Sequence, residues 1–308
     1  MDWGRAHMDL HQLKVFHTAV QAGSFTNASR KLNLSQSTVS QHIKQLEDDL
    51  GCPLFMRVGK QVIPTPAGRL LYEHCERIFQ DVMNAEMSIQ ELSGQRKGRV
   101  RFGSGATTLI YQLPHVLELY RALYPDVELI VVSDISEVLR QEVLAHRLDL
   151  ALVMLPVEEP NLQVEPLCME ELKVAVPARH PLAKKRELRA SDLAQLRFIL
   201  YERRTVMRQL IDNFLSDLGV QPQVSMVMEN IEAIKSLIGS GLGASVLPVH
   251  AIGNEAADRK VRLMRVKGKR LHRQLALITL KSNYLPFAVR ELGRLIAEEL
   301  NRRGAQRG

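Results

Sequence analysis

The sequence is poor in cysteine, and this scarcity excludes several kinds of protein. Its 308 residues include three cysteines, Cys52, Cys75 and Cys168, which are too few and too scattered for a disulfide framework or a zinc finger. A reducing compartment fits this composition. Cys168 has no second cysteine near it in sequence, so a redox-sensor role is disfavoured.

The sequence also lacks a hydrophobic run of about 18 residues, the length that spans a membrane. Its first residues, MDWGRAHMDLHQL, contain no apolar core of the roughly 7–15 residues that a secretory signal peptide requires. We therefore expect a cytoplasmic protein with no membrane partner.

Motifs of the common enzyme classes are missing as well. There is no G-x-S-x-G, no H-E-x-x-H, no P-loop and no Cys/His cluster, and the ten histidines are dispersed. Gly239, Gly241 and Gly243 do not have the G-x-G-x-x-G spacing and follow a predicted helix, so we interpret them as packing and turn residues. The sequence predicts a protein that is not an enzyme and holds no metal or cofactor.

What is present is an ordinary globular composition with a basic excess. Hydrophobic residues make up 45% and charged residues 24%, and the net charge is +7. This charge weakly favours an anionic partner such as nucleic acid. The first 66 residues hold only seven Lys and Arg against five Asp and Glu. Any nucleic-acid hypothesis must therefore rest on motifs rather than on bulk charge.

Residues 9–63 have the pattern of three helices followed by a short ribbon. The second helix, SFTNASRKL, has Ser24 as its expected N-cap, and its Ala28 is small enough for a close helix crossing. The three-residue turn NLS then ends at Ser35, the expected N-cap of the third helix. Two short helices joined in this way are typical of a helix-turn-helix.

The third helix combines an apolar stripe with an uncharged polar start. The stripe, which should face the core, consists of Val39, Ile43, Leu46 and Leu50. The early residues outside the stripe are Gln36, Ser37, Ser40 and Gln41. A face that is only solvated would normally carry more Glu and Lys. We therefore expect this face to contact a polar partner at close range.

A wing and a long helix follow. In MRVGKQVIPT, Gly59 can turn a hairpin that carries Arg57 and Lys60. Thr65 and Pro66 have the residue types of an N-cap and a first helical position. The helix they begin has a heptad seam of Leu71, Cys75, Ile78, Val82, Ala85, Ile89 and Leu92. The seam predicts dimerisation through the same helix of a second subunit; the alternative is packing on its own domain, with Cys75 as a small apolar filler.

From Arg99 onward, predicted strands and helices alternate over about 200 residues, which indicates an α/β fold built on parallel sheets. The strands include RVRFGSG, VELIVVSD, DLALVML, LKVAVPA, RFILY, QVSMVM, ASVLPV, VRLMRV and RQLALITL, and LPFAVRELGRLIAEELNRR is the last helix. The basic linker SGQRKG, residues 93–98, separates this part from the long helix.

These residues resemble the LysR-type transcriptional regulators over essentially the whole chain from Met8. The resemblance is carried by LKVFHTAVQAGSFTNASRKLNLSQSTVSQHIKQLEDDLGCPLFMR, by TPAG at the start of the long helix, and by HPLA and GLGASVLP downstream. Many members have Arg where this chain has Gln41, so contacts at that position should differ in kind.

The resemblance implies three parts. These are a winged helix-turn-helix DNA-binding domain at 8–65, a linker and dimerisation helix at 66–94, and an effector-binding domain at 98–308. The last should have two lobes like a periplasmic binding protein, with lobe I at about 98–165 and 267–308 and lobe II at about 166–266. Such proteins usually assemble as tetramers.

For DNA binding, the expected contacts come from the start of the third helix and from the wing. Gln36 can read adenine through N6 and N7, and Gln41 could do the same. Ser35 is favoured as a cap, and for Ser37 capping and solvation are the alternative to contact. The full predicted set is Ser35, Gln36, Ser37, Thr38, Ser40, Gln41, Lys44 and Arg57.

For effector binding, the resemblance points to loops that end strands and begin helices. GSGATT, SDISE and YERRTV offer the hydroxyls of Thr107, Thr108, Ser136 and Thr205, at positions where family members hold small effectors, often anions. Each hydroxyl alone is better explained as a helix N-cap, and only the four together form a candidate site. Arg203 and Arg204 are either solvated or, if one points inward, select an anionic ligand. Asn230 is expected to begin a further helix facing the cleft.

The sequence thus predicts a ligand-responsive, sequence-specific transcriptional regulator that binds an inverted-repeat operator. Expected partners are double-stranded DNA, a small-molecule effector that can be an anion, and further copies of the chain in a homodimer or homotetramer; RNA polymerase is a further candidate. The alternative is a small-molecule-binding protein or an enzyme with no DNA-regulating role.

Overall fold

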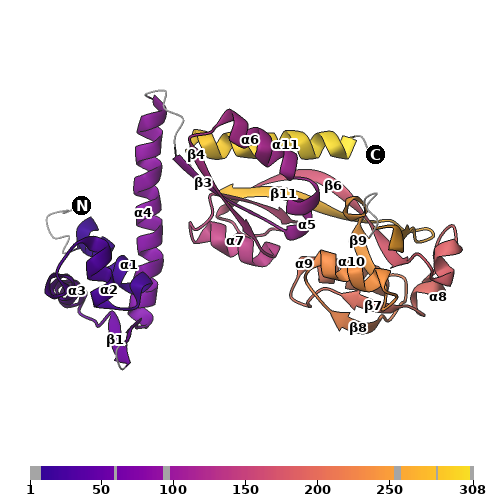
Figure 1. Ribbon diagram of the computed structural model, residues 1–308, viewed down its shortest axis with the longest axis horizontal. Coiled ribbons are helices and arrows are strands. Elements are labelled where there is room, and N and C mark those ends of the chain that lie inside the picture. The colour runs from indigo at the N-terminus through magenta and orange to yellow at the C-terminus, as the bar shows by residue number, and fades with distance from the viewer. Residues whose placement is uncertain (1–7, 59–60, 93–97, 253–257, 282–283, 306–308) are drawn as a thin grey trace. The chain divides into compact units, whose positions relative to one another are not determined.

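The computed structural model describes residues 8–58, 61–92, 98–252, 258–281 and 284–305. The chain forms two compact units, Met1–Glu86 and Met87–Gly308 (Figure 1). We call them the N-terminal unit and the regulatory unit. The long helix α4, Pro66–Leu92, begins in the first and ends in the second. The domain bounds expected from the sequence stay a prediction.

Three short helices, each bounded by recognisable caps, begin the N-terminal unit. They are α1, Leu10–Ala22, α2, Phe25–Leu32, and α3, Gln36–Leu50. Gly23, at φ 61°, ends α1 in the left-handed region. Ser24 stands at the N-cap of α2 as predicted, but its side chain makes no capping hydrogen bond, so that part of the prediction was wrong.

The core of this unit lies where the three helices meet. Phe16, Ala28 and Val39 are fully buried in it. Ile43 and Leu46 are buried as the apolar stripe predicts, whereas Leu50 is 42% exposed. The stripe is therefore one residue shorter than expected, because α3 ends at Leu50 and Gly51 turns the chain away.

The predicted wing is an antiparallel ribbon. Strand β1, Phe55–Val58, pairs with β2, Gln61–Pro64. Its predicted turn residues, Gly59 and Lys60, lie outside the described residues, as does the side chain of Arg57. Glu47 of α3 holds the start of the ribbon, because its Oε1 accepts from the Leu54 and Phe55 amides at 2.7 and 3.2 Å.

The first half of the heptad seam of helix α4 packs within the N-terminal unit. The Thr65 hydroxyl accepts from the Gly68 amide at 3.0 Å, which confirms the predicted cap. Cys75 is buried, and Leu71 and Ile78 pack beside it on the core of the three short helices. At these positions the helix packs on its own domain, which is the alternative that the sequence left open, and their part in dimerisation stays a prediction. Farther along the seam, Val82 and Ile89 are 38% and 66% exposed and Ala85 is exposed, while the side chain of Leu92 is outside the described part.

The regulatory unit has the predicted two-lobed α/β architecture. Lobe I contains strands of the main sheet and the helices that cover them, as Figure 1 shows. These elements are β3, Gly98–Ser104, α5, Ala106–Tyr111, α6, Pro114–Leu123, β4, Val127–Ser133, α7, Ser136–Leu144, β5, Leu150–Met154, and the C-terminal α11, Phe287–Ala305. Helix α6 restarts at Pro114, and the buried Tyr120 donates to the Ala288 carbonyl of α11 at 2.8 Å.

Lobe II follows a long crossing strand. Its elements are α8, Ala190–Leu193, β7, Arg197–Leu200, α9, Val206–Ser216, β8, Gln223–Val227, α10, Ile231–Gly239, β9, Ser245–Pro248, and β10, Val261–Met264. Gly241 has a φ of 86°, and a Cβ on Gly243 would lie 2.8 Å from the Arg197 carbonyl oxygen. These glycines serve turn and packing, as predicted.

The main sheet is mixed, which corrects the expectation of parallel sheets. Its order is β10-β6-β11-β5-β3-β4, with β9 also paired to β6. Strand β6, Leu162–Pro177, and β11, Leu271–Leu280, are antiparallel to each other and contribute to both lobes. Apart from isolated bridges, parallel strand pairing within the described residues is limited to β3 with β4 and β5, and β7 with β8. The sequence predicted only the second half of β6, because LQVEPLCMEE has a proline and interspersed carboxylates.

Candidate nucleic-acid interface and ligand cavity

The start of α3 is capped by Ser35, as predicted. The Ser35 hydroxyl accepts from the Thr38 amide at 3.0 Å and lies 2.7 Å from the Ser37 hydroxyl oxygen. The first turn contains no acidic residue. Because the free amides of a helix N-terminus carry partial positive charge, this turn can face phosphate without repulsion.

The predicted reading residues occupy the solvent side of α3. Gln36, Ser37, Gln41 and Lys44 are exposed, and Ser40 is half-buried. Gln36 Nε2 donates to the Ser40 hydroxyl at 2.8 Å, so this pair is already ordered before any base is present. Thr38 is half-buried behind them. Their contacts with DNA stay predictions.

A cavity of about 410 Å³ lies between the two lobes of the regulatory unit. Its walls come from the β3–α5 and β4–α7 connections, from β5 and β11, and from the N-termini of α9 and α10. Among the predicted effector residues, the structure places Thr107, Thr108, Ser136 and Thr205 on its lining, together with Asn230.

The four hydroxyls differ in their local roles. Thr205 caps α9, since its oxygen accepts from the Arg208 amide at 3.2 Å. Thr107 and Thr108 lie inside the first turn of α5, whose N-cap is Gly105, and Ser136 is the first residue of α7. For these three the capping alternative was wrong. Ser136 instead accepts from the Met154 amide of β5 at 3.0 Å.

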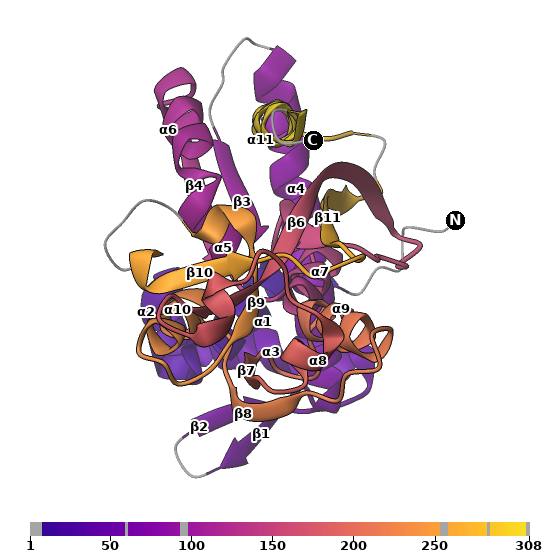
Figure 2. The same cartoon turned by 90° about the vertical axis from the view of Figure 1, so that its right-hand side faces the viewer.

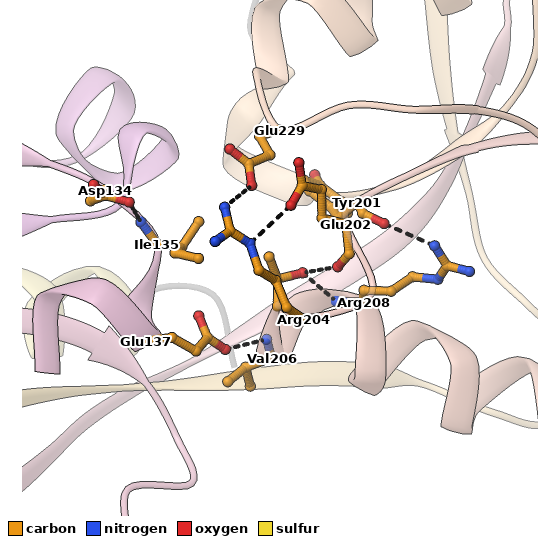
Figure 3. A network of polar contacts seen from close by, with 10 residues as sticks. Asp134, Ile135, Glu137, Tyr201, Glu202, Arg204, Val206, Arg208 and Glu229 are labelled. Atoms are coloured by element: carbon orange, nitrogen blue, oxygen red, sulfur yellow. Dashed lines mark hydrogen bonds and ion pairs between the residues drawn. The ribbon is translucent and has the colours of Figure 1, made fainter. Parts of the chain in front are cut away.

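The paired arginines of YERRTV do not serve as inward cations. Arg203 is exposed and does not line the cavity. Arg204 is exposed too, and it reaches Glu202 at 2.9 Å and Glu229 at 3.5 Å, as Figure 3 shows. The solvated alternative was therefore correct for both residues.

A carboxylate of lobe I reaches the first helical amide of lobe II. Val206 N donates to Glu137 Oε1 at 2.7 Å, and the two residues face each other across the gap in Figure 3. Behind this contact, the buried Arg208 donates to the Tyr201 carbonyl at 2.9 Å and pairs with Asp212. Burial raises the pKa of the Tyr201 phenol to about 12, so its hydroxyl stays neutral at the cavity wall.

The buried cation of the cavity is Arg273 of β11. It is 8% exposed and its Nε donates to the buried Glu170 of β6. Glu170 also accepts from Gln112, and His250 Nδ1 lies 3.6 Å from its Oε1. Burial by itself would raise the pKa of Glu170, but the charges of Arg273 and His250 and these hydrogen bonds bring it below its ordinary value.

Two atoms on the cavity-lining residues are buried without a hydrogen-bond partner among the described residues. One is a donor, Arg273 Nη2, and the other is an acceptor, Glu137 Oε2. Buried polar atoms are nearly always paired, so each calls for a partner.

Sequence reasoning missed Arg273, Glu137 and Glu170, although a signal for the first was present. In β11, Leu271, Arg273 and Leu275 alternate on one buried face, and a charge inside an apolar alternation indicates a paired, buried ion. Glu137 had the weaker signal of an acid in a first helical turn.

Other kinds of site are not supported in the described ranges. No group of three or more His, Cys, Asp and Glu is placed to hold a metal ion there. Likewise, none of the helices in those ranges has the length and apolarity to cross a bilayer.

Two family models match the chain. The model of the bacterial regulatory helix-turn-helix protein, lysR family, matches residues 10–69, and that of the LysR substrate binding domain matches residues 93–301. Together they cover both units of the structure.

Relatives and solved structures agree with these matches. The RuBisCO operon transcriptional regulator of Allochromatium vinosum is 32% identical over 88% of this chain and 90% of its own. The regulator CysL of Bacillus subtilis is 29% identical over 86% and 89%. Among structures, full-length OxyR of Pseudomonas aeruginosa has a TM-score of 0.74 at 23% identity, covering 96% and 95% of the two chains. CbnR complexed with its target DNA has a TM-score of 0.69 at 20% identity, covering 96% and 99%.

The family and these relatives are transcriptional regulators rather than enzymes. With a helix-turn-helix that presents an acid-free N-terminus and a ligand cavity between two lobes, the chain belongs to the LysR family of transcriptional regulators, which bind DNA and small-molecule effectors.

Proposed function

We propose that this regulator responds to a small anion that also carries hydroxyl or ammonium groups. The observation that carries the proposal is a pair of buried atoms without a hydrogen-bond partner among the described residues, the donor Arg273 Nη2 and the acceptor Glu137 Oε2, on two residues that line the cavity. A ligand that offers an anionic oxygen to the first and a hydrogen-bond donor to the second satisfies both.

The energetics favour such a ligand. A buried polar group without a partner costs about 1–3 kcal/mol, and a hydrogen bond to a charged group contributes about 1.5–3 kcal/mol. The acids Asp134, Glu137 and Glu229 on the lining argue against a molecule that is anionic throughout. The hydroxyl-bearing Thr107 and Ser136 also line the cavity and offer neutral contacts.

The response follows from where the ligand sits. Glu137 belongs to α7 of lobe I and Val206 to α9 of lobe II, and both line the cavity. A ligand with more contacts in one arrangement of the lobes shifts the population toward it. This shift is the proposed input to DNA binding.

At the DNA end, we propose that α3 enters the major groove and that Gln36 and Gln41 read base edges, with Lys44 and Arg57 on phosphates. The exposed seam residues Val82, Ala85 and Ile89 would join two chains. A homodimer, alone or within a homotetramer, then reads an inverted repeat with half-sites separated by multiples of about 10 bp. RNA polymerase is the expected partner for activation.

The test uses thermal unfolding of the full chain with a panel of small hydroxylated carboxylates and phosphates, each paired with its neutral ester or alcohol. At about 100 times its Kd, a specific ligand adds about 2.7 kcal/mol, which raises the midpoint by roughly 5–10 °C in a domain of this size. The neutral analogues should give no shift.

Variants then assign the site. Arg273→Lys and Thr107→Val should each lose most of the shift. Arg273→Lys removes the guanidinium nitrogen Nη2, and Thr107→Val removes one hydroxyl. Arg203→Gln should keep the shift, since Arg203 lies outside the cavity. A shift that is lost in Arg203→Gln and kept in Arg273→Lys and Thr107→Val would contradict the proposed site.

A further inference from the structure

Two basic segments of the regulatory unit together carry a larger net positive charge than the whole chain does. Residues 178–189, ARHPLAKKRELR, and 258–270, DRKVRLMRVKGKR, together contain twelve Lys and Arg against two Asp and Glu. This excess of ten exceeds the net charge of +7 of all 308 residues. The basic character of the protein is therefore concentrated here rather than in its DNA-binding unit.

The two segments are joined by backbone hydrogen bonds at both ends. At one end, the Ala178 amide donates to the Lys260 carbonyl at 2.7 Å. At the other, the Leu188 amide donates to the Arg265 carbonyl and the Lys267 amide to the Leu188 carbonyl, both at 2.8 Å. Figure 2 looks onto this end of the regulatory unit, where β10 and α8 are labelled. The backbone thus holds the two rows of cations next to each other.

Nearly all of these cations face solvent. Eleven of the twelve are exposed and Lys269 is half-buried. Two of the twelve cations form ion pairs with described residues, Lys185 with Asp192 at 2.7 Å and Lys269 with Asp217 at 2.6 Å. The other ten, which we call the basic face, make no ion pair with any described residue; they are Arg179, Lys184, Arg186, Arg189, Arg259, Lys260, Arg262, Arg265, Lys267 and Arg270.

We propose that the basic face binds the phosphate backbone of double-stranded DNA, independently of base sequence. Ten neighbouring like charges repel one another, and this repulsion is relieved when a polyanion releases its counterions to them. Neither segment contains Phe, Tyr or Trp. Single-stranded nucleic acid is held largely by base stacking on aromatic rings, so the composition favours the duplex backbone.

This contact is separate from operator reading by α3 and does not depend on the effector. It would add phosphate contacts to those of the N-terminal unit, so it would raise affinity for any long duplex without changing which sequence is preferred. An acidic surface of RNA polymerase is the competing partner, and the experiment distinguishes the two.

The experiment measures binding of the full chain to an operator carried on a long duplex, at several salt concentrations. Each phosphate contact contributes about 0.9 to the slope of log K against log salt. Arg186→Gln with Lys267→Gln, one from each segment, should lower the magnitude of the slope by up to about 1.8. The ratio of operator to non-operator affinity should not change.

A matched control removes the same charge elsewhere on the regulatory unit. Lys281→Gln with Arg290→Gln replaces two exposed cations outside both segments and should leave the slope at the wild-type value. Thermal midpoints of both variants show whether they remain folded. If the basic-face variant keeps the wild-type slope, the proposal is overturned. If the variant keeps this slope but loses binding to purified RNA polymerase, the basic face binds an acidic surface of the polymerase instead of DNA.

Discussion

Glu137 and Val206 connect the two lobes through one hydrogen bond of 2.7 Å, from the first backbone amide of α9 to a carboxylate in the first turn of α7. The contact satisfies an amide that has no partner inside its own helix, and it places negative charge at the positive end of α9. The second oxygen of the same carboxylate is buried without a partner among the described residues, and in the proposed function this carboxylate also recognises the ligand.

Replacing Glu137 should loosen the regulatory unit in two steps. Glu137→Gln keeps an acceptor for Val206 but removes the charge, which costs about 0.3–1 kcal/mol. Glu137→Ala also removes the hydrogen bond and should cost about 1–2 kcal/mol, or roughly 2–8 °C in the thermal midpoint. Identical midpoints for wild type and Glu137→Ala would show that the contact contributes nothing.

Removing one partner of the Glu170–Arg273 pair should destabilise the fold more than removing both. Both side chains are buried, at 5% and 8% exposure. Arg273→Met leaves a buried carboxylate without its main counter-charge and should cost about 3–5 kcal/mol. Adding Glu170→Gln should recover most of that loss, measured by thermal unfolding at neutral pH. Equal losses in the single and the double variant would contradict this view.

The same carboxyl predicts a dependence on pH. The folded-state pKa of Glu170 lies below its ordinary value of 4.5. Its ionised form therefore stabilises the fold fully above pH 4.5, and this contribution is lost as the pH falls through the lower folded-state pKa. Glu170→Gln should flatten the loss of stability in this acidic range. A profile as steep as that of the wild type would assign acid unfolding to other carboxyls.

Gln36 should contribute to sequence preference rather than to general affinity. Gln36→Ala removes a candidate bidentate contact and should cost about 1–3 kcal/mol at one operator base pair. Gel-shift titrations with operators changed at single positions measure this. Lys44→Gln is the matched comparison, since a phosphate contact should weaken all sequences equally. Uniform weakening by Gln36→Ala would mean that Gln36 does not read a base.

The buried thiols should be unreactive in the native protein. Burial raises the pKa of Cys168 to about 11 and that of Cys75 to about 12, so neither forms thiolate at neutral pH. Brief treatment with iodoacetamide should modify Cys52, which is half-buried, and spare the other two. Modification is located by peptide mass spectrometry. Rapid labelling of Cys168 would reopen a redox role for it.

The outer half of the α4 seam should control assembly. Val82→Asp places a charge on the predicted interface and should shift the full chain toward monomer in analytical ultracentrifugation. Met83→Asp is the matched control, because Met83 is similarly exposed, at 40%, but lies outside the seam. An unchanged sedimentation coefficient for Val82→Asp would exclude this part of α4 as the interface.

Local signals in the sequence predicted the elements of the DNA-binding unit well. Caps at Ser35 and Thr65 and the stripe through Val39, Ile43 and Leu46 are all present in the structure, because each depends on neighbours within a few residues. Leu50 was assigned wrongly to the buried stripe, and the seam pattern alone did not show that Leu71, Cys75 and Ile78 pack on the N-terminal unit. Periodicity identifies an apolar face but does not say what covers it.

The cavity was predicted only in part, because its charged groups depend on distant pairing. Thr107, Ser136 and Thr205 follow strands and could be found from their positions in loops. Arg273 and Glu170 lie on different strands and are more than a hundred residues apart in sequence. No local sequence pattern predicts which carboxylate a buried arginine pairs with. The antiparallel crossing of β6 and β11 has the same origin, since alternation of elements does not reveal strand direction.

The central position of β11 in the sheet also determines the order in which the two units can fold during synthesis. It lies between β6 and β5 in the sheet, yet it ends at Leu280, near the C-terminus, and α11 follows it. Neither lobe can complete its hydrogen bonding until the chain up to Leu280 has left the ribosome, whereas the strands and short helices of the N-terminal unit, Met1–Glu86, have all left it long before. A nascent chain can thus acquire its DNA-binding surface well before it can sense a metabolite.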